Sequence, residues 1–230
     1  KMVKRIFFAV CLFATATIFG FAGDIASFVN LGFSGDGRYF MFGQYGINEE
    51  SLPYAEIYTV DVPANNFVAG GVFKREYPVA VNPGQEGQGA LFTLLHTARD
   101  YVNKYRIDHM KPGRILYLLL NGDDPERSLS FRDFETGNRY SIDLIQSSRG
   151  SGKSVEAAFY ITMSLTRSSG ASSDYTIGRP GYYRSGVRGY QVRSIYASPD
   201  EGSLVFVIER EEADTGGANI RYMVETVAIR

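Results

Sequence analysis

The residues best suited to bind a ligand lie in one segment near the C-terminus, residues 175–199. This segment is rich in arginine, tyrosine and glycine and contains no acidic residue. Arginine presents a planar guanidinium that pairs with carboxylate or phosphate, and tyrosine adds a stacking surface with a polar tip. We therefore predict a loop that binds an anionic ligand, formed by Arg179, Tyr182, Tyr183, Arg184, Arg188, Tyr190 and Arg193.

The overall charge leaves an alternative open for these arginines. The chain has 24 basic and 25 acidic residues, for a net charge of −1. Charge clusters often form structural ion pairs, so the arginines would then only neutralise acidic residues elsewhere in the fold. The near-neutral balance also argues against nucleic acid as a partner.

The first 22 residues have the pattern of an export signal. A basic start, "KMVKR", precedes an apolar run over residues 6–22 that ends in the small-residue site Gly20-Phe21-Ala22. An uncleaved anchor helix is the alternative, because the run is just long enough to span a bilayer. The only cysteine, Cys11, lies inside this segment, so disulfides and thiolate sites are excluded from the mature chain.

We therefore expect a signal peptide at residues 1–22 and a single exported domain at 23–230, located in the periplasm or secreted. Contact with a membrane is expected only through the signal segment before cleavage. In such a compartment the partners would be an envelope protein or an anionic ligand such as a glycan or a peptidoglycan carboxylate.

Other motifs that suggest chemistry do not meet their structural requirements. "SSRGSGKS", residues 147–154, lacks the first glycine of a phosphate-binding loop and precedes a strand pattern. The acidic run at 121–126 lacks the spacing of a calcium loop. His96 and His109 have no serine in a nucleophile-elbow context. We predict no catalytic residue, metal ligand or cofactor, and consider enzymatic activity uncertain and less favoured than binding.

Alternation of apolar and polar residues predicts a mainly β fold of antiparallel sheets. "GRILYLLLNG", residues 113–122, is apolar on both faces, as in a buried central strand. Helical spacing of apolar residues predicts one amphipathic helix near 89–105.

A turn motif occurs twice, at Gly35-Asp36-Gly37 and at Pro199-Asp200-Glu201-Gly202, each time before a strand. Aspartate bonds its own backbone two residues on, and glycine takes the positive φ of the reversal. The stretch "FSGDGRYFMF…YAEIYTVDV" is similar to blades of TolB-type and WD40-like propellers. We predict propeller-like blades, with a β-sandwich or an irregular β fold as the alternative, because about twelve strands are fewer than four complete blades need.

A second resemblance covers nearly the whole mature chain. It rests on "GDIASFVNLGFSGDGRYFMFGQYG", "GRILYLLLNG", "SLSFRDFETGNRY", "GVRGYQVRSI" and "NIRYMVETV". These phrases resemble the spirochaete exported-protein family labelled domain of unknown function 2259. The resemblance implies a predicted secreted protein without an established activity. We expect a non-catalytic binding protein of the cell envelope, with a hydrolase acting on an envelope polymer as the alternative.

Overall fold

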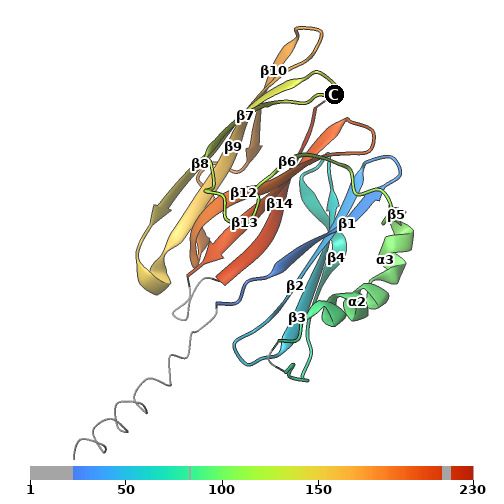
Figure 1. The fold of residues 1–230 in the computed structure, drawn as a ribbon, viewed down its shortest axis with the longest axis vertical. Helices are drawn as coiled ribbons and strands as arrows, with labels where there is room; N and C mark the ends of the chain where they lie inside the picture. The colour runs from blue at the N-terminus through green and yellow to red at the C-terminus, as the bar shows by residue number, and fades with distance from the viewer. Residues whose placement is uncertain (1–22, 83, 214–218, 230) are drawn as a thin grey trace, which may run out of the picture.

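The computed structural model describes residues 23–82, 84–213 and 219–229, and these form three antiparallel sheets and two helices (Figure 1). The predicted signal segment lies outside the described residues. Among the described residues, no helix combines the length and apolar character needed to cross a membrane.

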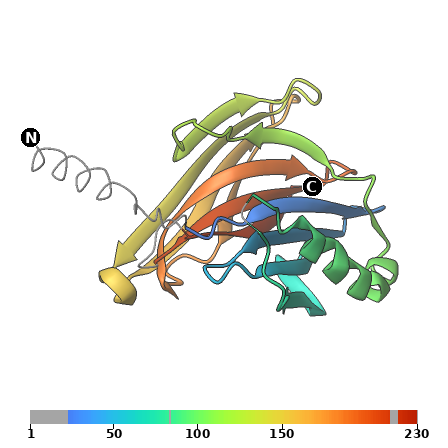
Figure 2. The same cartoon turned by 60° about the horizontal axis from the view of Figure 1, so that its bottom comes forward.

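The helix-covered sheet contains five strands in the order β4-β3-β2-β1-β5. Its strands are β1 (Ser27–Ser34), β2 (Tyr39–Ile47), β3 (Pro53–Asp61), β4 (Asn66–Glu76) and β5 (Ile107–Asp108). The helices α2 (Gln88–Thr97) and α3 (Arg99–Lys104) cover one of its faces (Figure 2). Leu91, Leu94 and Ala98 are buried against this sheet. The predicted amphipathic helix is thus present, with a break at Ala98 between its two parts.

The central sheet contains four strands in the order β14-β13-β12-β6. Its strands are β6 (Arg114–Leu118), β12 (Val187–Ala197), β13 (Ser203–Glu212) and β14 (Asn219–Ala228). The outer sheet is built from β7 (Ser128–Arg132), β8 (Arg139–Arg149), β9 (Glu156–Thr166) and β10 (Ser172–Gly178), with β11 (Arg184–Ser185) also paired to β9. A short 3-10 turn, Gly152–Ser154, joins β8 to β9.

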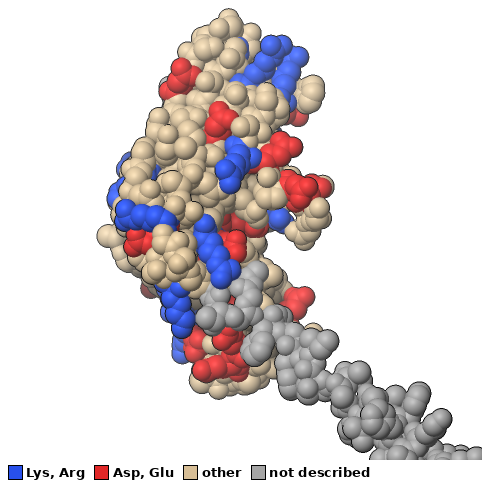
Figure 3. All heavy atoms as spheres, turned by 90° about the vertical axis from the view of Figure 1, so that its left-hand side faces the viewer, with Lys and Arg blue, Asp and Glu red and all other residues tan. Residues whose placement is uncertain are grey.

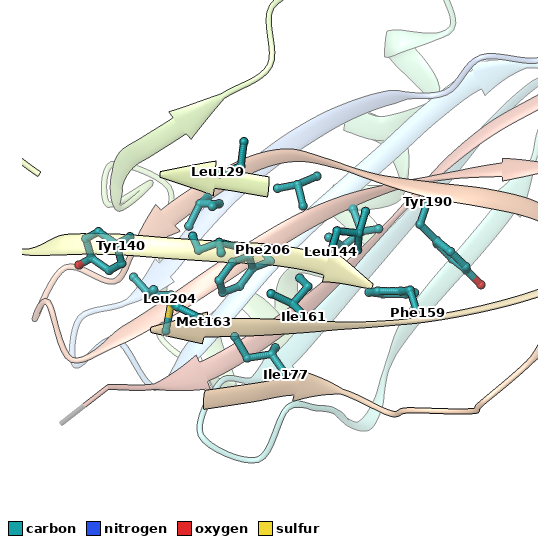
Figure 4. Close-up of a cluster of buried hydrophobic side chains, with 14 of the residues drawn as sticks. Leu129, Tyr140, Leu144, Phe159, Ile161, Met163, Ile177, Tyr190, Leu204 and Phe206 are labelled. Atoms are coloured by element: carbon teal, nitrogen blue, oxygen red, sulfur yellow. The ribbon is translucent and has the colours of Figure 1, made fainter. Parts of the chain in front are cut away.

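The central sheet is buried on both faces, and β13 shows why its sequence is continuously apolar. Leu204, Phe206 and Ile208 pack against the outer sheet, where their neighbours form the core in Figure 4. Val205 and Val207, between them, point to the opposite face and pack against the helix-covered sheet. Since alternate side chains enter two different cores, no polar position is left along this part of the strand.

The prediction that "GRILYLLLNG" forms a buried central strand is wrong about its position in the sheet. Its strand, β6, is an edge strand that pairs only with β12, and Ile115 and Leu118 are about half exposed. The buried central strand of the molecule is β13. An apolar run alone does not distinguish the two, because sheet order depends on pairing between distant segments.

The mainly β, antiparallel fold is confirmed, whereas the propeller-like expectation is not. The three sheets lie face to face in layers and share two apolar cores, and the described residues form no ring of blades (Figures 1 and 2). This stacking is closer to the sandwich that the sequence left as its alternative.

The repeated motif forms the same turn twice. In the first, the Ser34 hydroxyl donates to Asp36 (2.6 Å) and accepts from the Tyr39 N–H (2.9 Å). In the second, the Ser198 hydroxyl donates to Asp200 (2.6 Å) and accepts from the Ser203 N–H (3.0 Å). The predicted aspartate bond to the backbone two residues on is also present in both turns.

The glycine assignment needs a correction in the second turn. The positive φ falls on Gly37 (+72°) in the first turn but on Glu201 (+56°), rather than Gly202, in the second. The two turns lie against each other, since a Cβ added to Gly37 would come within 2.5 Å of Asp200 Oδ1. If the two motifs are aligned on their last glycines, Gly37 and Gly202, the alignment is therefore shifted by one residue, because Gly37 corresponds to Glu201.

The first described residues are joined to the last strand. Ile25 forms a parallel bridge with Ile220. The side chain of Arg221 pairs with the carboxylate of Asp24, which also accepts a hydrogen bond of 2.8 Å from the Tyr54 hydroxyl. The start of the described chain is thereby held against β14.

Candidate ligand-binding cleft

The seven predicted binding residues do not converge on one site. Three of them, Arg179, Tyr182 and Arg184, line a single cleft. Arg188 and Tyr190 line a separate hollow of about 290 Å³ between the outer and central sheets. The predicted loop is therefore divided by the fold into parts that face different surroundings.

The remaining two residues lie apart from the cleft. The Tyr183 hydroxyl is 3.0 Å from Ser147 Oγ, and its ring stacks under the guanidinium of Arg149. Arg193 donates to Asn121 Oδ1 at 2.7 Å and lies 3.5 Å from Glu209. Both side chains are held by neighbours within the fold.

Three of the four arginines have acidic partners, as the alternative interpretation of their charge requires. The pairs are Arg184 with Glu225 (3.8 Å), Arg188 with Glu211 (3.3 Å) and Arg193 with Glu209 (3.5 Å). Within the described part of the chain, Arg179 has no ion pair inside 4.0 Å. Its charge still acts on the Glu225 carboxylate, but from beyond ion-pair distance.

Charges are also mixed over the face of the molecule seen in Figure 3. Basic and acidic side chains alternate there across a mostly uncharged surface. This face therefore offers no broad field of one sign that would attract a charged partner from a distance.

The cleft has a volume of about 480 Å³ and lies between the central and helix-covered sheets. One wall comes from β14, another from β3 and β4, and the third from residues 179–184, which follow β10. Its apolar lining includes Phe42, Tyr58, Phe67, Val72, Tyr182 and Tyr222. A volume of this size is typical of small-molecule and short-peptide sites.

An irregularity in β4 exposes part of this lining. Val60 pairs with Phe67 and Tyr58 pairs with Val72, so the single residue between them on β3, Thr59, faces four residues on β4. Such an insertion bends the strand and redirects its side chains. Phe67 and Val72, on either side of it, are 44% and 41% exposed on β4, which is an edge strand with mostly exposed residues.

Tyr182 lines the cleft and lies close to two cations. The guanidinium of Arg184 is 4.9 Å from the centre of its ring, and that of Arg179 is 5.9 Å away. Arg184 also lies over Phe159 and Tyr190, which hold its side chain in place. Tyr182 is 50% exposed, so it offers an open aromatic surface beside two positive charges.

A buried carboxylate, Glu225, is part of the cleft lining. Glu225 accepts a hydrogen bond of 2.6 Å from Asn65 Nδ2 and lies 3.8 Å from Arg184. Burial raises the pKa of the Glu225 carboxyl above its usual range, while the Asn65 hydrogen bond opposes that rise. Asn65 also accepts from the Thr226 N–H at 2.8 Å, so one side chain ties the β3–β4 turn to β14.

The other charged side chains of the cleft are paired. Lys74 lies 2.9 Å from Glu56, which also accepts from the Tyr58 hydroxyl, and Arg210 pairs with Glu212. Glu225 interacts with both Arg184 and Arg179, so these three side chains together carry one excess positive charge. The cleft is therefore suited to a ligand with an apolar body and one anionic group.

Several residues of the cleft were not identified from the sequence. Phe67, Val72, Asn65 and Glu225 come from segments that no motif connects to residues 179–184. One local signal exists, since two glycines inside a strand, as at 70 and 71, indicate a bulge. The pairing of β14 with the β3–β4 turn has no such local signal.

The hydrolase alternative requires converging catalytic groups. Among the described residues that line the cleft, Glu225 is the single carboxylate. His109 Nδ1 is 2.6 Å from the Leu31 carbonyl oxygen, and the described residues contain no serine–histidine hydrogen bond. They also contain no group of three or more acidic, histidine or cysteine residues that would hold a metal ion.

Comparison with known proteins identifies a family. The family model described as "Predicted secreted protein (DUF2259)" matches residues 41–228, which includes every segment that lines the cleft. No curated protein matches the chain. Because the match covers most of the sequence, this chain belongs to the DUF2259 family of predicted secreted proteins.

Proposed function

We propose that this protein is an exported, non-catalytic binding protein of the cell envelope that holds an anionic ligand in the inter-sheet cleft. The observation that supports the proposal is the exposure of three large apolar side chains, Phe67, Val72 and Tyr182, in the same cleft as Arg179. Exposed apolar patches of soluble proteins commonly mark binding sites.

The chemistry of the cleft defines the ligand. The exposed rings bury an apolar or planar body, and the guanidinium of Arg179 pairs with a carboxylate or phosphate. In the cell envelope, peptidoglycan carboxylates, anionic glycans and acidic partner proteins have such groups. The family's description as predicted secreted proteins supports a role outside the cytoplasm.

Calorimetric titration tests the proposal with two defined probes, a peptidoglycan fragment with free carboxylates and an acidic oligosaccharide. Each probe is compared with its carboxyl-amidated or carboxyl-reduced form. We expect binding of at least one charged probe, weakened about tenfold by Arg179→Ala and by Tyr182→Ala, as for loss of a charge-assisted contact.

The matched control is Arg188→Ala, which removes an arginine of the same segment outside the cleft. The control should bind as the unmodified protein does. Equal weakening by all three substitutions, or by none, would contradict a site in this cleft.

A further inference from the structure

β14 is an edge strand of the central sheet, and the backbone groups on its unpaired side indicate what kind of ligand the cleft can bind. Three of its backbone N–H groups point away from β13 and have partners elsewhere. Ile220 donates to the Asp24 carbonyl (3.0 Å), Tyr222 to Gln44 Oε1 (2.7 Å) and Thr226 to Asn65 Oδ1 (2.8 Å). Because hydrogen bonding alternates along an antiparallel strand, every second residue of β14 faces outward in this way.

Val224 has the same orientation as these three residues but has no acceptor for its N–H among the described residues. It lines the cleft and is only 8% exposed. Buried backbone N–H groups are nearly always paired, because leaving one without a partner costs free energy. An N–H that lines a cleft and has no acceptor among the described residues is therefore a position where a ligand acceptor is expected.

The carbonyl group of Val224 points to the same side as its N–H, since an outward residue of an antiparallel strand presents both groups together. A residue of an extended peptide bonds to such a pair through its own C=O and N–H. Gln44 and Asn65 occupy the neighbouring positions on the edge, so the open stretch is limited to the surroundings of one residue.

We propose that the ligand is a short extended peptide that pairs with Val224 and carries a carboxylate next to an apolar side chain. The apolar side chain packs against Phe67 and Tyr182, and the carboxylate pairs with Arg179. This inference rests on the proposed function, because it assumes that the cleft is the binding site. Strand spacing limits the bound part to about three or four residues between the two amide side chains.

The peptide backbone is the feature that favours this class over a glycan. The edge presents one backbone donor and one backbone acceptor in the spacing of a strand, which matches the backbone of an extended peptide, and Phe67 and Val72 beside it offer apolar contact for a side chain. A glycan with the same carboxylate would use Arg179 and Tyr182 but would have no reason to depend on the Val224 N–H.

The test uses the fluorescent-labelled tetrapeptide Gly-Val-Phe-Glu and three modified forms. One is N-methylated at phenylalanine, one is amidated at its C-terminus, and one has glutamine in place of glutamate. We expect N-methylation to weaken binding about five- to tenfold, as for loss of one hydrogen bond in a desolvated site. The amidated form and the glutamine form each lack one carboxylate, so comparing them shows whether the terminal or the side-chain carboxylate pairs with Arg179.

A protein variant tests the same contact from the other side. Val224→Pro removes the N–H, and the sheet should tolerate it because this group is not used to pair with β13. We expect Val224→Pro to lose peptide binding while the sheet stays intact. The control is Val227→Pro: the Val227 N–H pairs with β13, so this variant shows the effect of disturbing the sheet itself. If Val224→Pro does not fold, the Val224 amide is followed directly by NMR and should shift on titration.

The outcomes separate this inference from the proposed function. If the acidic oligosaccharide binds in a manner dependent on Arg179 and Tyr182 but no peptide does, the cleft remains the site and the peptide proposal is overturned. Equal binding of the N-methylated and unmodified peptides also overturns it, as does an unchanged Val224 amide. Peptide binding that survives Arg179→Ala and Tyr182→Ala would contradict both proposals.

Discussion

The two copies of the Ser-x-Asp turn, residues 34–39 and 198–203, have the same hydrogen bonds but differ in the residue at positive φ. In the first turn this residue is Gly37, and the second turn packs so close to it that a side chain would meet Asp200. In the second turn the residue is Glu201, whose carboxylate lies 2.7 Å from Arg114 Nη2.

This difference shows that serine and aspartate define the turn, whereas the fourth position depends on its surroundings. A left-handed backbone is strained for any residue with a Cβ, so glycine is expected there. Glutamate is tolerated at position 201 because its side chain has space and a cationic partner, Arg114. The following predictions test this division, from the largest expected effect to the smallest.

The largest effect is expected from Gly37→Ala. The substitution combines a positive φ of +72° with a Cβ only 2.5 Å from Asp200 Oδ1. We expect the free energy of unfolding to fall by about 2–4 kcal/mol, as the sum of backbone strain and overpacking. Chemical denaturation followed by circular dichroism measures it.

The control for this variant is Gly181→Ala, which has the same φ of +72° but no atom within 4 Å of the added Cβ. It should cost only the backbone strain, about 1–2 kcal/mol. If both variants were equally destabilised, contact between the two turns would have no part in requiring glycine at position 37.

Next in size is the matched pair Ser34→Ala and Ser198→Ala. Each removes the acceptor of a backbone N–H, from Tyr39 or from Ser203, and a donor to the aspartate. We expect each to lose about 1–3 kcal/mol, with the larger loss for Ser198, because its bond to Ser203 is fully buried. Thermal and chemical denaturation of the two variants in parallel measures both losses. A larger loss for Ser34 would contradict the argument from burial.

A pH-dependent effect is expected from the ion network that holds only the second turn. Arg114 bonds Asp133 through two nitrogens (2.8 and 2.9 Å) and also bonds Glu201. The Arg114 guanidinium lowers the pKa of the Asp133 carboxyl from 3.8 to about 2. Since the folded-state pKa is the lower one, this stabilisation is present above about pH 4 and is lost as the pH falls towards 2.

Arg114→Ala should therefore lose about 1–2 kcal/mol of stability at pH 7, after allowance for solvent screening, and less at pH 2. Unfolding free energies measured between pH 2 and 7 give the slope for both proteins. Arg38→Ala, which breaks the more exposed pair with Asp61 beside the first turn, is the control and should change the slope less. Identical slopes for Arg114→Ala and the unmodified protein would contradict the role of this network.

The smallest effect is expected from Glu201→Gly. Glycine relieves the positive φ of +56°, while the partly exposed ion pair with Arg114 is lost. Both contributions are at most about 1 kcal/mol and have opposite signs, so the net change in unfolding free energy should be near zero. A loss above about 2 kcal/mol would mean that glutamate is required at this position for more than its charge.

Local patterns predicted much of the fold. The alternation of β8 and β9, the helical spacing of α2 and the side-chain bond of Asp36 all depend on residues close in sequence. The edge position of β6 and the double burial of β13 depend on which strands pair and which faces meet. These are properties of the assembled sheets, so hydrophobic periodicity alone does not determine them.

The candidate site was predicted only in part for the same reason. Residues 179–184 have an unusual composition, and three of them do reach the cleft. Arg188 and Arg193 share that composition, but β12 carries them to Glu211 and Glu209. The opposite wall, from Asn65 to Val72, and the unpaired edge at Val224 could not be predicted from the sequence. Both belong to the cleft only because β14 lies beside the β3–β4 turn.

The pairing of Asp24 with Arg221 sets the order in which the structure can be completed. The two residues are 197 positions apart, and Ile25 finds its partner in the same late strand. During synthesis the N-terminal strands emerge long before β14 exists, so the closing contacts wait for almost the entire polypeptide.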